Sequence, residues 1–189
     1  MRAIVVYESM FGNTRQIADA IGKGMAELHD VRIINVNLVK PEDTESADLV
    51  VVGGPTHVHG MSRPNTREEA EKWTRDPLKK LQMESGAPGR GIREWLDDRA
   101  TKVPTLFAGF ATRIDVPIIL SGNAAAQIDR VLHRRAARLV DAENFLVTKD
   151  SHLGDHEIDR ARAWGIELGK ALATAGIPAG SDFSRNDEA

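Results

Sequence analysis

Residues 8–17, with the sequence ESMFGNTRQI, leave the apolar run AIVVY through short polar side chains around a single glycine. Ser9, Asn13 and Thr14 offer side-chain hydrogen-bond donors, and Gly12 lets the backbone turn so that its N–H groups face inward. A helix that begins at Asn13 or Thr14 adds free N–H groups and a dipole that favours an anion. The pattern therefore indicates a phosphate-binding loop, although a tight strand-to-helix turn with a polar helix cap would explain the same residues.

This stretch matches neither of two common nucleotide-binding loops. It lacks the Gly-x-x-x-x-Gly-Lys-Ser/Thr run of a P-loop, and its single glycine does not form the Gly-x-Gly-x-x-Gly fingerprint of a dinucleotide site. The chain also contains no cysteine, which excludes a disulfide framework, a thiolate metal site and a thiol redox centre. Any redox chemistry therefore requires a bound cofactor.

Histidine and arginine side chains follow the third apolar run of the chain. His57 and His59 in PTHVHGM offer imidazoles that contact a ligand ring, transfer a proton or stand in solvent. Arg63 and Arg67 come next, and guanidinium groups there would meet the anionic part of a substrate, a pyridine nucleotide or a partner protein. A solvated loop explains the two arginines equally well, so the sequence leaves their role open.

Two other charged clusters are better explained without a ligand. Acidic residues at the start of the last helical segment are what helix capping and the helix dipole favour, so we predict no metal site there. That cluster comprises His152, Asp155, His156 and Asp159. The fourth helical pattern carries a basic face, which we interpret as its solvated side rather than as a dock for an acidic partner. Its members are Arg130, His133, Arg134, Arg135 and Arg138.

Five short apolar runs have the composition of buried parallel strands. They span residues 3–7, 31–36, 48–54, 103–110 and 143–147. Helical periodicity lies between them, with apolar residues three and four positions apart. The clearest stripes are Ile17, Ile21, Met25 and Leu28 in the first helix, Ile128, Val131, Leu132 and Leu139 in the fourth, and Ile158, Ala161, Trp164, Leu168 and Leu172 in the last. This alternation predicts βαβ units and hence an α/β fold, with a five-stranded parallel sheet that helices cover on both faces.

The crossovers between the strands differ greatly in length. The second, residues 39–47, has room for one or two helical turns at most. The third is long and contains a helix-like stretch at 66–83, a segment rich in glycine and proline at 84–91 and a second helix-like stretch at 92–100. We expect Trp73 and Trp95 to bury their indoles against the sheet, with a lid over the site as the alternative role of this crossover.

Length, composition and charge set the remaining bounds. A chain of 189 residues with 41% hydrophobic content suits one domain, which we assign to residues 1–176, with a disordered tail at 177–189. The net charge of −3 gives no field that would attract nucleic acid. Without an apolar run near the roughly 18 residues that a membrane span needs, we expect a cytoplasmic protein. The sequence does not indicate the oligomeric state.

The stretch YESMFGNTRQIADAI resembles the phosphate loop of the flavodoxin family, in which Ser/Thr-x-Thr/Phe-Gly-Asn-Thr follows the first strand. The resemblance implies a three-layer sandwich with strand order 2-1-3-4-5 and a flavin mononucleotide (FMN) outside the carboxyl ends of the strands, where the strand order reverses. The residues that would hold the FMN phosphate are Ser9, Met10, Phe11, Gly12, Asn13 and Thr14.

Two further loops extend the resemblance to about residues 1–175. The stretch DLVVVGGPTHVHGMSRP is similar to the family's second flavin loop, especially in flavodoxin-domain proteins of actinobacteria, and FAGFATRIDVP takes the position of the third. The second loop implies contacts with the flavin ring from Pro55, Thr56, His57, Val58, His59 and Gly60, and Met61 is a further candidate. The third loop implies contacts from Gly109, Phe110, Ala111, Thr112 and Arg113.

The chain departs from the electron-shuttling members of the family, which carry loop aromatics and a strongly acidic surface. Its three tryptophans lie in helical patterns, and His59 stands where relatives place an aromatic ring. The resemblance implies an FMN protein that transfers electrons, either to an unidentified redox partner or, as an oxidoreductase of the NAD(P)H/quinone type, to a small-molecule acceptor. The alternative is a binding or interaction module that kept the fold and lost the flavin.

Overall fold

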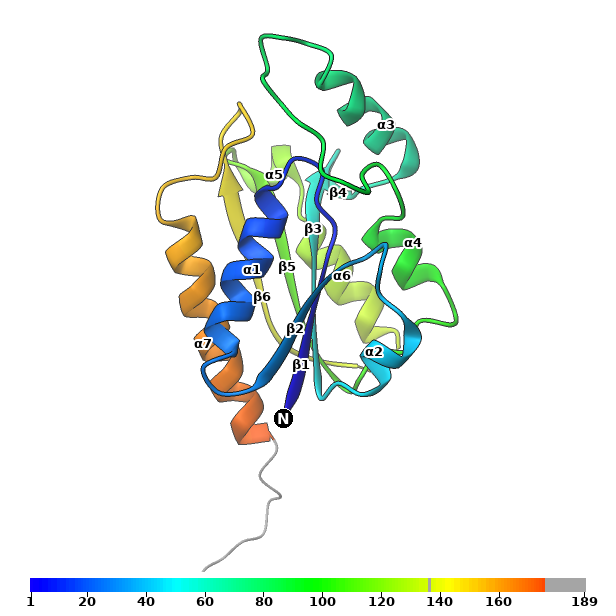
Figure 1. Cartoon of the computed structure of the whole chain (residues 1–189), viewed down its shortest axis with the longest axis vertical. Coiled ribbons are helices and arrows are strands. Elements are labelled where there is room, and N and C mark those ends of the chain that lie inside the picture. The colour runs from blue at the N-terminus through cyan, green and yellow to red at the C-terminus, as the bar shows by residue number, and fades with distance from the viewer. Residues whose placement is uncertain (136, 176–189) are drawn as a thin grey trace, which may run out of the picture.

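The computed structural model describes residues 1–135 and 137–175, which form a three-layer α/β sandwich (Figure 1). Its parallel strands are arranged in the order β2-β1-β3-β5-β6, which confirms the predicted five-stranded order. One short strand was not predicted. It forms because the chain turns back after the third strand and pairs with that strand in antiparallel fashion. The predicted domain end at 176 and the tail at 177–189 lie outside the described residues.

The strands begin and end close to the predicted apolar runs in the first half of the chain. They are β1 (Arg2–Tyr7), β2 (Asp30–Asn35), β3 (Leu49–His57), β4 (Gly60–Met61), β5 (Leu106–Ile114) and β6 (Arg138–Val147). The prediction was wrong by several residues for β5 and β6. β5 pairs with β3 as far as Thr112 opposite Pro55, and β6 extends over Arg138–Val147 because its first half pairs with β5 although it includes the charged residues Arg138 and Asp141.

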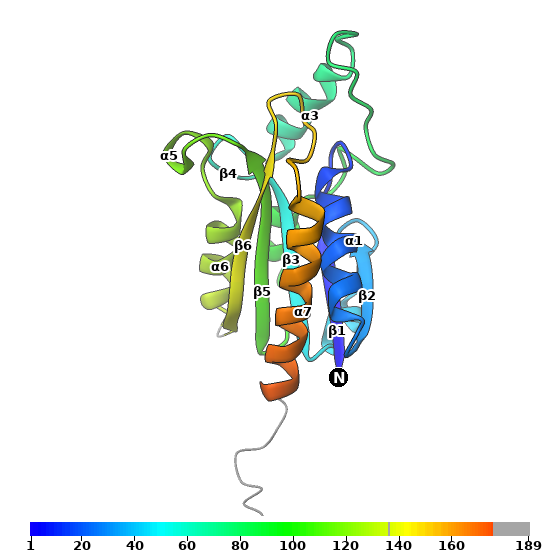
Figure 2. The ribbon, with the colours of Figure 1, turned by 90° about the vertical axis from the view of Figure 1, so that its left-hand side faces the viewer.

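Helices cover both faces of the sheet (Figures 1 and 2). They are α1 (Asn13–Met25), α2 (Pro41–Glu45), α3 (Pro64–Trp73), α4 (Ile92–Asp97), α5 (Ile118–Ser121), α6 (Ala124–His133) and α7 (Glu157–Ala175). One core lies between the sheet and the pair α1 and α7, and the other lies between the sheet and the helices α4 and α6. Figure 2 shows α3 beyond the carboxyl ends of the strands rather than on a face of the sheet.

The helices α1 and α7 approach each other closely enough to require glycine on both. A Cβ atom added to Gly24 would lie 2.2 Å from the carbonyl oxygen of Arg162, and one added to Gly165 would lie 2.2 Å from that of Ile21. The backbones of the two helices are therefore in direct contact, and this contact fixes the position of α1 relative to α7.

The predicted helical stripes were correct at most positions and wrong at three. Leu139 lies in β6, since α6 ends at His133. Leu28 follows the end of α1 and is 53% exposed, while Ile158 lies on the outer side of α7. Trp95 is buried as predicted, but Trp73 is 40% exposed at the end of α3, which ends ten residues earlier than the predicted 66–83 stretch. No helix within the described residues is long and apolar enough to cross a membrane.

Candidate functional site

A cavity of about 690 Å³ opens at the carboxyl ends of the parallel strands, where the strand order reverses between β1 and β3. Such switch points are the usual ligand sites of open α/β sheets. The structure brings together here most of the residues that the sequence indicated. These are Met10, Phe11, Asn13, Thr14, Pro55, Thr56, His57, Val58, His59, Thr112 and Arg113.

The first loop leaves the start of α1 open. Gly12 is the residue before the helix and has a left-handed φ of 94°, a conformation that favours glycine. No side chain of the described residues caps this helix end, so the polar-cap explanation of the sequence does not hold. Ser9 instead accepts a hydrogen bond from the Gly12 N–H at 3.1 Å, which shapes the loop. The N–H groups of the first helical turn therefore remain available to an anion.

Two hydrogen bonds hold the polar side chains of this loop in place. The Thr14 hydroxyl lies 2.8 Å from the Thr112 hydroxyl at the end of β5, and the Asn13 side-chain amide donates to the Ser151 carbonyl at 2.7 Å. The first loop, the third loop and the segment before α7 are thus joined at one point. All four residues line the cavity, which gives this end of it a polar wall.

The second loop is a two-residue hairpin turn between β3 and β4. His57 pairs with Gly60, and the two residues between them, Val58 and His59, have positive φ values of 45° and 71°. Two consecutive left-handed residues are typical of a type I′ turn, which favours asparagine and glycine. A β-branched residue in this conformation is strained, and such strain gathers at ligand sites. Gly60 itself lies behind the turn, where an added Cβ atom would meet the Gln127 side chain at 2.2 Å.

His57 is held as a neutral imidazole inside the second loop. Burial, together with the smaller effect of the nearby positive charge of Arg67, lowers its pKa from 6.5 to about 4. Its Nδ1 atom lies 3.4 Å from the Thr66 hydroxyl in the first turn of α3. At neutral pH this side chain therefore provides hydrogen-bonding capacity without charge. Met61, also proposed to face the ring, is buried on β4 and lies outside the cavity lining.

Arg67 does not face a ligand, contrary to the substrate-contact alternative. Its side chain is buried, donates to the Ser62 hydroxyl at 2.8 Å and pairs with Glu94 at 3.0 Å. Glu8, at the end of β1, is buried beside it and accepts a hydrogen bond from the Ile92 N–H at 2.8 Å. Burial raises the pKa of the Glu8 carboxyl, while the Ile92 N–H and the Arg67 charge oppose this shift.

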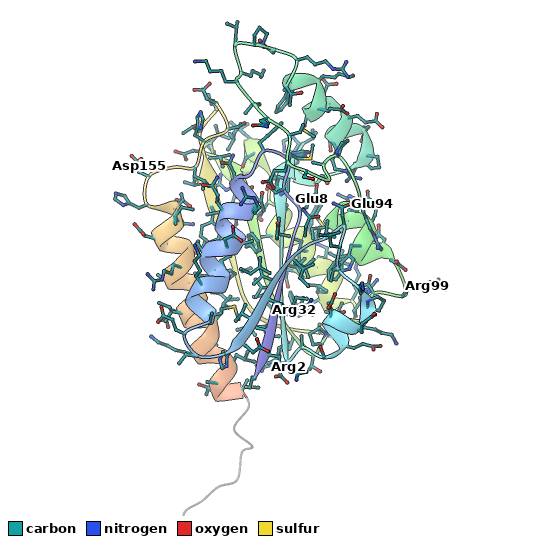
Figure 3. All side chains as sticks on the ribbon, in the orientation of Figure 1. Arg2, Glu8, Arg32, Glu94, Arg99 and Asp155 are labelled. Carbon is teal, nitrogen blue, oxygen red and sulfur yellow. The ribbon has the colours of Figure 1, made fainter. Side chains whose placement is uncertain are left out.

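Figure 3 shows Glu8 and Glu94 close together between the end of β1 and α4. The cluster ties the two helices of the third crossover to the strand that carries the first loop, because Arg67 belongs to α3 and Glu94 to α4. The cluster thereby fixes the position of α3 relative to the sheet. Arg63, the residue before α3, remains exposed outside this cluster.

The third loop begins later than the sequence indicated. Gly109, Phe110 and Ala111 lie inside β5, where Phe110 packs over Gly53, and they do not line the cavity. Thr112 and Arg113, the last two residues of the proposed set, do line it. The apolar residues Ile114, Val116 and Leu120 continue this wall and were not foreseen.

An aromatic pair, also not predicted, forms another wall. The rings of Phe11 and Trp73 are stacked with centroids 6.4 Å apart and an angle of 17° between their planes, and both residues line the cavity. The Lys79 ammonium lies 4.7 Å from the centre of the Trp73 ring. The sequence signal for this wall was the length of the third crossover. A lid over the site, which was the alternative role for that crossover, is close to the observed arrangement. The other α3 residues of the wall are Asn65, Thr66, Glu68, Glu69, Ala70 and Lys72.

The acidic cluster explained by helix capping and the basic face assigned to solvent differ in their surroundings. Within residues 1–135 and 137–175 no three metal-ligating side chains gather, and His156 only approaches Asp159 at 4.0 Å on the surface. The basic face was partly misread. Arg135 turns inward and donates to the carbonyls of Leu96, Asp98 and Thr101.

Fold and site together define a doubly wound α/β protein whose ligand cavity lies at the switch point of a parallel sheet. A family model described as Flavodoxin matches residues 5–95. Many solved structures with this fold carry the same family's name, and this agreement supports membership of the flavodoxin family. No curated protein sequence gives a significant match.

Three solved structures illustrate the similarity in fold. A flavodoxin from the domain Archaea superposes with a TM-score of 0.60 at 23% identity, covering 92% of this chain and 99% of its own. Oxidised Flavodoxin 1 from Bacillus cereus gives a TM-score of 0.61 at 17% identity, with 90% and 98% covered. Two-electron reduced Megasphaera elsdenii flavodoxin gives 0.56 at 17% identity, with 91% and 98% covered. The resemblance to actinobacterial proteins stays a prediction.

Proposed function

We propose that this chain binds FMN non-covalently in the cavity and passes electrons between a donor and an acceptor. The observation that carries the proposal is the start of α1. No side chain in the described part of the chain caps it, it follows a left-handed glycine, and it presents Asn13 and Thr14 to the cavity. A phosphate dianion there would accept hydrogen bonds from the free N–H groups and would be stabilised by the helix dipole.

The rest of the cavity fits the other parts of the same molecule. Its first-loop end is polar at Thr14 and Thr112, and Phe11, Trp73 and Leu120 add aromatic and aliphatic surface to its other walls. A volume of about 690 Å³ falls in the ordinary range for cofactor sites. A phosphate at one end and a flat ring against the apolar walls would satisfy both halves.

Each loop has a separate task in this proposal. Ser9 and Gly12 shape the first loop, and Met10, Phe11, Asn13 and Thr14 line the phosphate end. The second loop would lie beside the ring through Pro55, Thr56, His57, Val58 and His59, and Gly60 supports its turn from behind. Thr112 and Arg113 contribute from the third loop, while Gly109, Phe110 and Ala111 support it from inside the sheet. The bound flavin would supply the redox chemistry, and the protein would bind it, orient it and exclude water.

A flavin titration tests the proposal. Purified apoprotein should quench FMN fluorescence and shift its visible absorption on binding. Riboflavin should bind far more weakly, because it lacks the phosphate that the start of α1 would bind. No change with FMN at high protein concentration would contradict the proposal. That result would favour the alternative of a flavin-free binding module.

The acceptor is a separate question within the same proposal. The weak net charge argues against a carrier that docks through a strong acidic field, and the apolar wall formed by Val58, Ile114 and Leu120 suits an uncharged small molecule. Steady-state reduction of a soluble quinone by a reduced nicotinamide, with FMN bound, would distinguish an oxidoreductase from a protein that exchanges electrons only with another redox protein.

A further inference from the structure

Arg113 places a positive charge in the cavity wall without a carboxylate beside it. Its Nη1 atom donates to the carbonyl of Val116 at 2.7 Å, to the carbonyl of Ile114 at 3.2 Å and to the Ser121 hydroxyl at 3.3 Å. All of these acceptors are neutral, and among the described residues no Asp or Glu forms an ion pair with it. The charge on this guanidinium is therefore held in place but not neutralised.

The remaining donors of this guanidinium have no hydrogen-bond partner among residues 1–135 and 137–175. The Nε atom is buried without a hydrogen bond in the described part of the chain. The Nη2 atom makes none either and stays accessible. Buried or half-buried charges are ordinarily paired, since desolvation without a counter-charge is unfavourable. An arginine with spare donors in a cofactor cavity indicates an anionic ligand group beside it.

Arg113 belongs to the opposite end of the cavity from the phosphate. Thr112 points to the first loop, where it meets Thr14, and successive strand residues point to opposite faces. Arg113 holds Ser121 of α5, and the following residue, Gly122, bridges to His59 of the second loop. The guanidinium thus lies in the third loop, which meets the second loop through this bridge, and the proposed site places the flavin ring beside these two loops.

The other charges that line the cavity do not cancel this one. Glu69 and Lys72 pair with each other at 3.0 Å on α3, and Glu68 is exposed on the same helix, in the wall opposite. His57 is neutral. Because Glu68 is exposed to water, its effect at the ring is screened more strongly than that of the half-buried Arg113.

We propose that Arg113 stabilises the negative charge of the two-electron-reduced flavin, an inference that rests on the proposed FMN site. Two-electron reduction adds two electrons and one proton to the ring, so that one negative charge remains. A fixed guanidinium then favours the reduced cofactor over the neutral oxidised ring. The site is consequently suited to two-electron transfer to an acceptor rather than to the low-potential exchange of a one-electron carrier.

The test compares the affinities of oxidised and dithionite-reduced FMN. The parent protein should bind reduced FMN at least as tightly as oxidised FMN, so the two-electron potential of bound FMN should equal or exceed that of free FMN. A parent potential well below that of free FMN would overturn the inference without any variant. Failure of the parent to bind FMN at all would contradict the proposed function instead.

Three variants assign the effect to the charge. Arg113→Gln should weaken reduced FMN about tenfold more than oxidised FMN, which corresponds to a fall of about 30 mV in the two-electron potential. Arg113→Lys should keep the ratio of the two affinities within about threefold. Arg135→Gln is the matched control, because Arg135 is also held by backbone carbonyls but lies outside the cavity lining, and it should leave the ratio unchanged. An unchanged ratio in folded Arg113→Gln would refute the inference.

Discussion

The hydroxyl groups of Thr14 and Thr112 lie 2.8 Å apart, although 98 residues separate them in the chain. Thr14 stands in the first turn of α1 and Thr112 near the end of β5, so the bond joins the first loop to the third. It can form because the parallel strands bring their carboxyl ends to one edge of the sheet. One of the two hydroxyl hydrogens is used in this bond, and the other remains free for a ligand.

Removing either hydroxyl should weaken FMN binding selectively. We expect Thr14→Val to lower the affinity for FMN by about 10-fold to 100-fold, because a hydrogen bond to a charged oxygen contributes roughly 1.5–3 kcal/mol. The affinity for riboflavin should change little. Fluorescence titrations with both flavins measure the difference. Thr44→Val is the matched control, since Thr44 is equally buried but donates its hydroxyl to the Pro41 carbonyl within α2. Equal losses for FMN and riboflavin would show that Thr14 only supports the loop.

Trp73 should contribute to binding of the ring rather than to stability. Trp73→Leu is expected to weaken both FMN and riboflavin by about 3-fold to 10-fold, since aromatic pairs contribute roughly 0.5–1.5 kcal/mol beyond buried area. Trp73→Phe should retain most of the affinity. The free energy of unfolding should stay nearly constant, because the side chain is 40% exposed. If Trp73→Leu binds both flavins like the parent, the indole packs only against Phe11.

Acid should destabilise the apoprotein through His57. Its folded pKa of about 4 lies below the unfolded value of 6.5, so the folded state resists taking up the proton. The stability that the neutral imidazole provides is complete above pH 6.5 and falls as the pH drops toward 4, by about 3 kcal/mol in all. Urea unfolding at pH 7.5 and 4.5 should show a smaller loss in His57→Gln than in the parent. His152→Gln changes an exposed histidine and should lose as much stability between the two pH values as the parent. If His57→Gln also loses as much stability as the parent, the acid sensitivity arises from other groups.

Glu8 should act in the opposite direction. Burial raises its folded pKa above the ordinary 4.5, so its contribution is complete below pH 4.5 and is lost as the pH rises through the folded pKa. Glu8→Gln removes the ionisation, and the gap in stability between variant and parent should shift in the variant's favour between pH 4.5 and pH 8. Chemical unfolding across this range measures the gap. Glu68→Gln, on the exposed side of α3, should show a constant gap, and a constant gap for Glu8→Gln would mean that its carboxyl titrates normally.

The sheet and the first loop could be read from the sequence because both depend on local patterns. A buried parallel strand is a short apolar run, and VVYESMFGNT combines such a run with the turn and helix start that follow it. The ends of the strands were harder to predict from the sequence. β5 continues to Ile114 because β3 offers backbone partners as far as Thr112 and β6 offers them as far as Ile114, and this depends on pairing between distant segments.

The wall of the cavity formed by α3 could not be derived from local pattern. Trp73 faces the cavity because Arg67, two turns earlier on the same helix, is buried against Glu8 and Glu94. Both carboxylates come from segments far from α3 in the chain, so the orientation of the helix is a tertiary effect. The same holds for Leu139, whose apolar side chain suits a helix or a strand until β5 supplies its partner, Phe107.

Val58→Asn should stabilise the apoprotein. Val58 is 80% exposed and has a φ of 45°, so its side chain gains little from burial while its backbone is strained. Asparagine is several-fold more common than other non-glycine residues in this conformation and is typical of type I′ turns. Relief of the strain should raise the free energy of unfolding by about 1 kcal/mol.

Ile119→Asn serves as the control for Val58→Asn, because Ile119 is also an exposed aliphatic residue near the cavity but has no positive φ. This control should leave the free energy of unfolding within about 0.5 kcal/mol of the parent value. Equilibrium urea unfolding of the three apoproteins measures both effects. A Val58→Asn variant no more stable than the parent would show that the turn accommodates valine without strain, and that the conformation at Val58 is not maintained at the expense of stability.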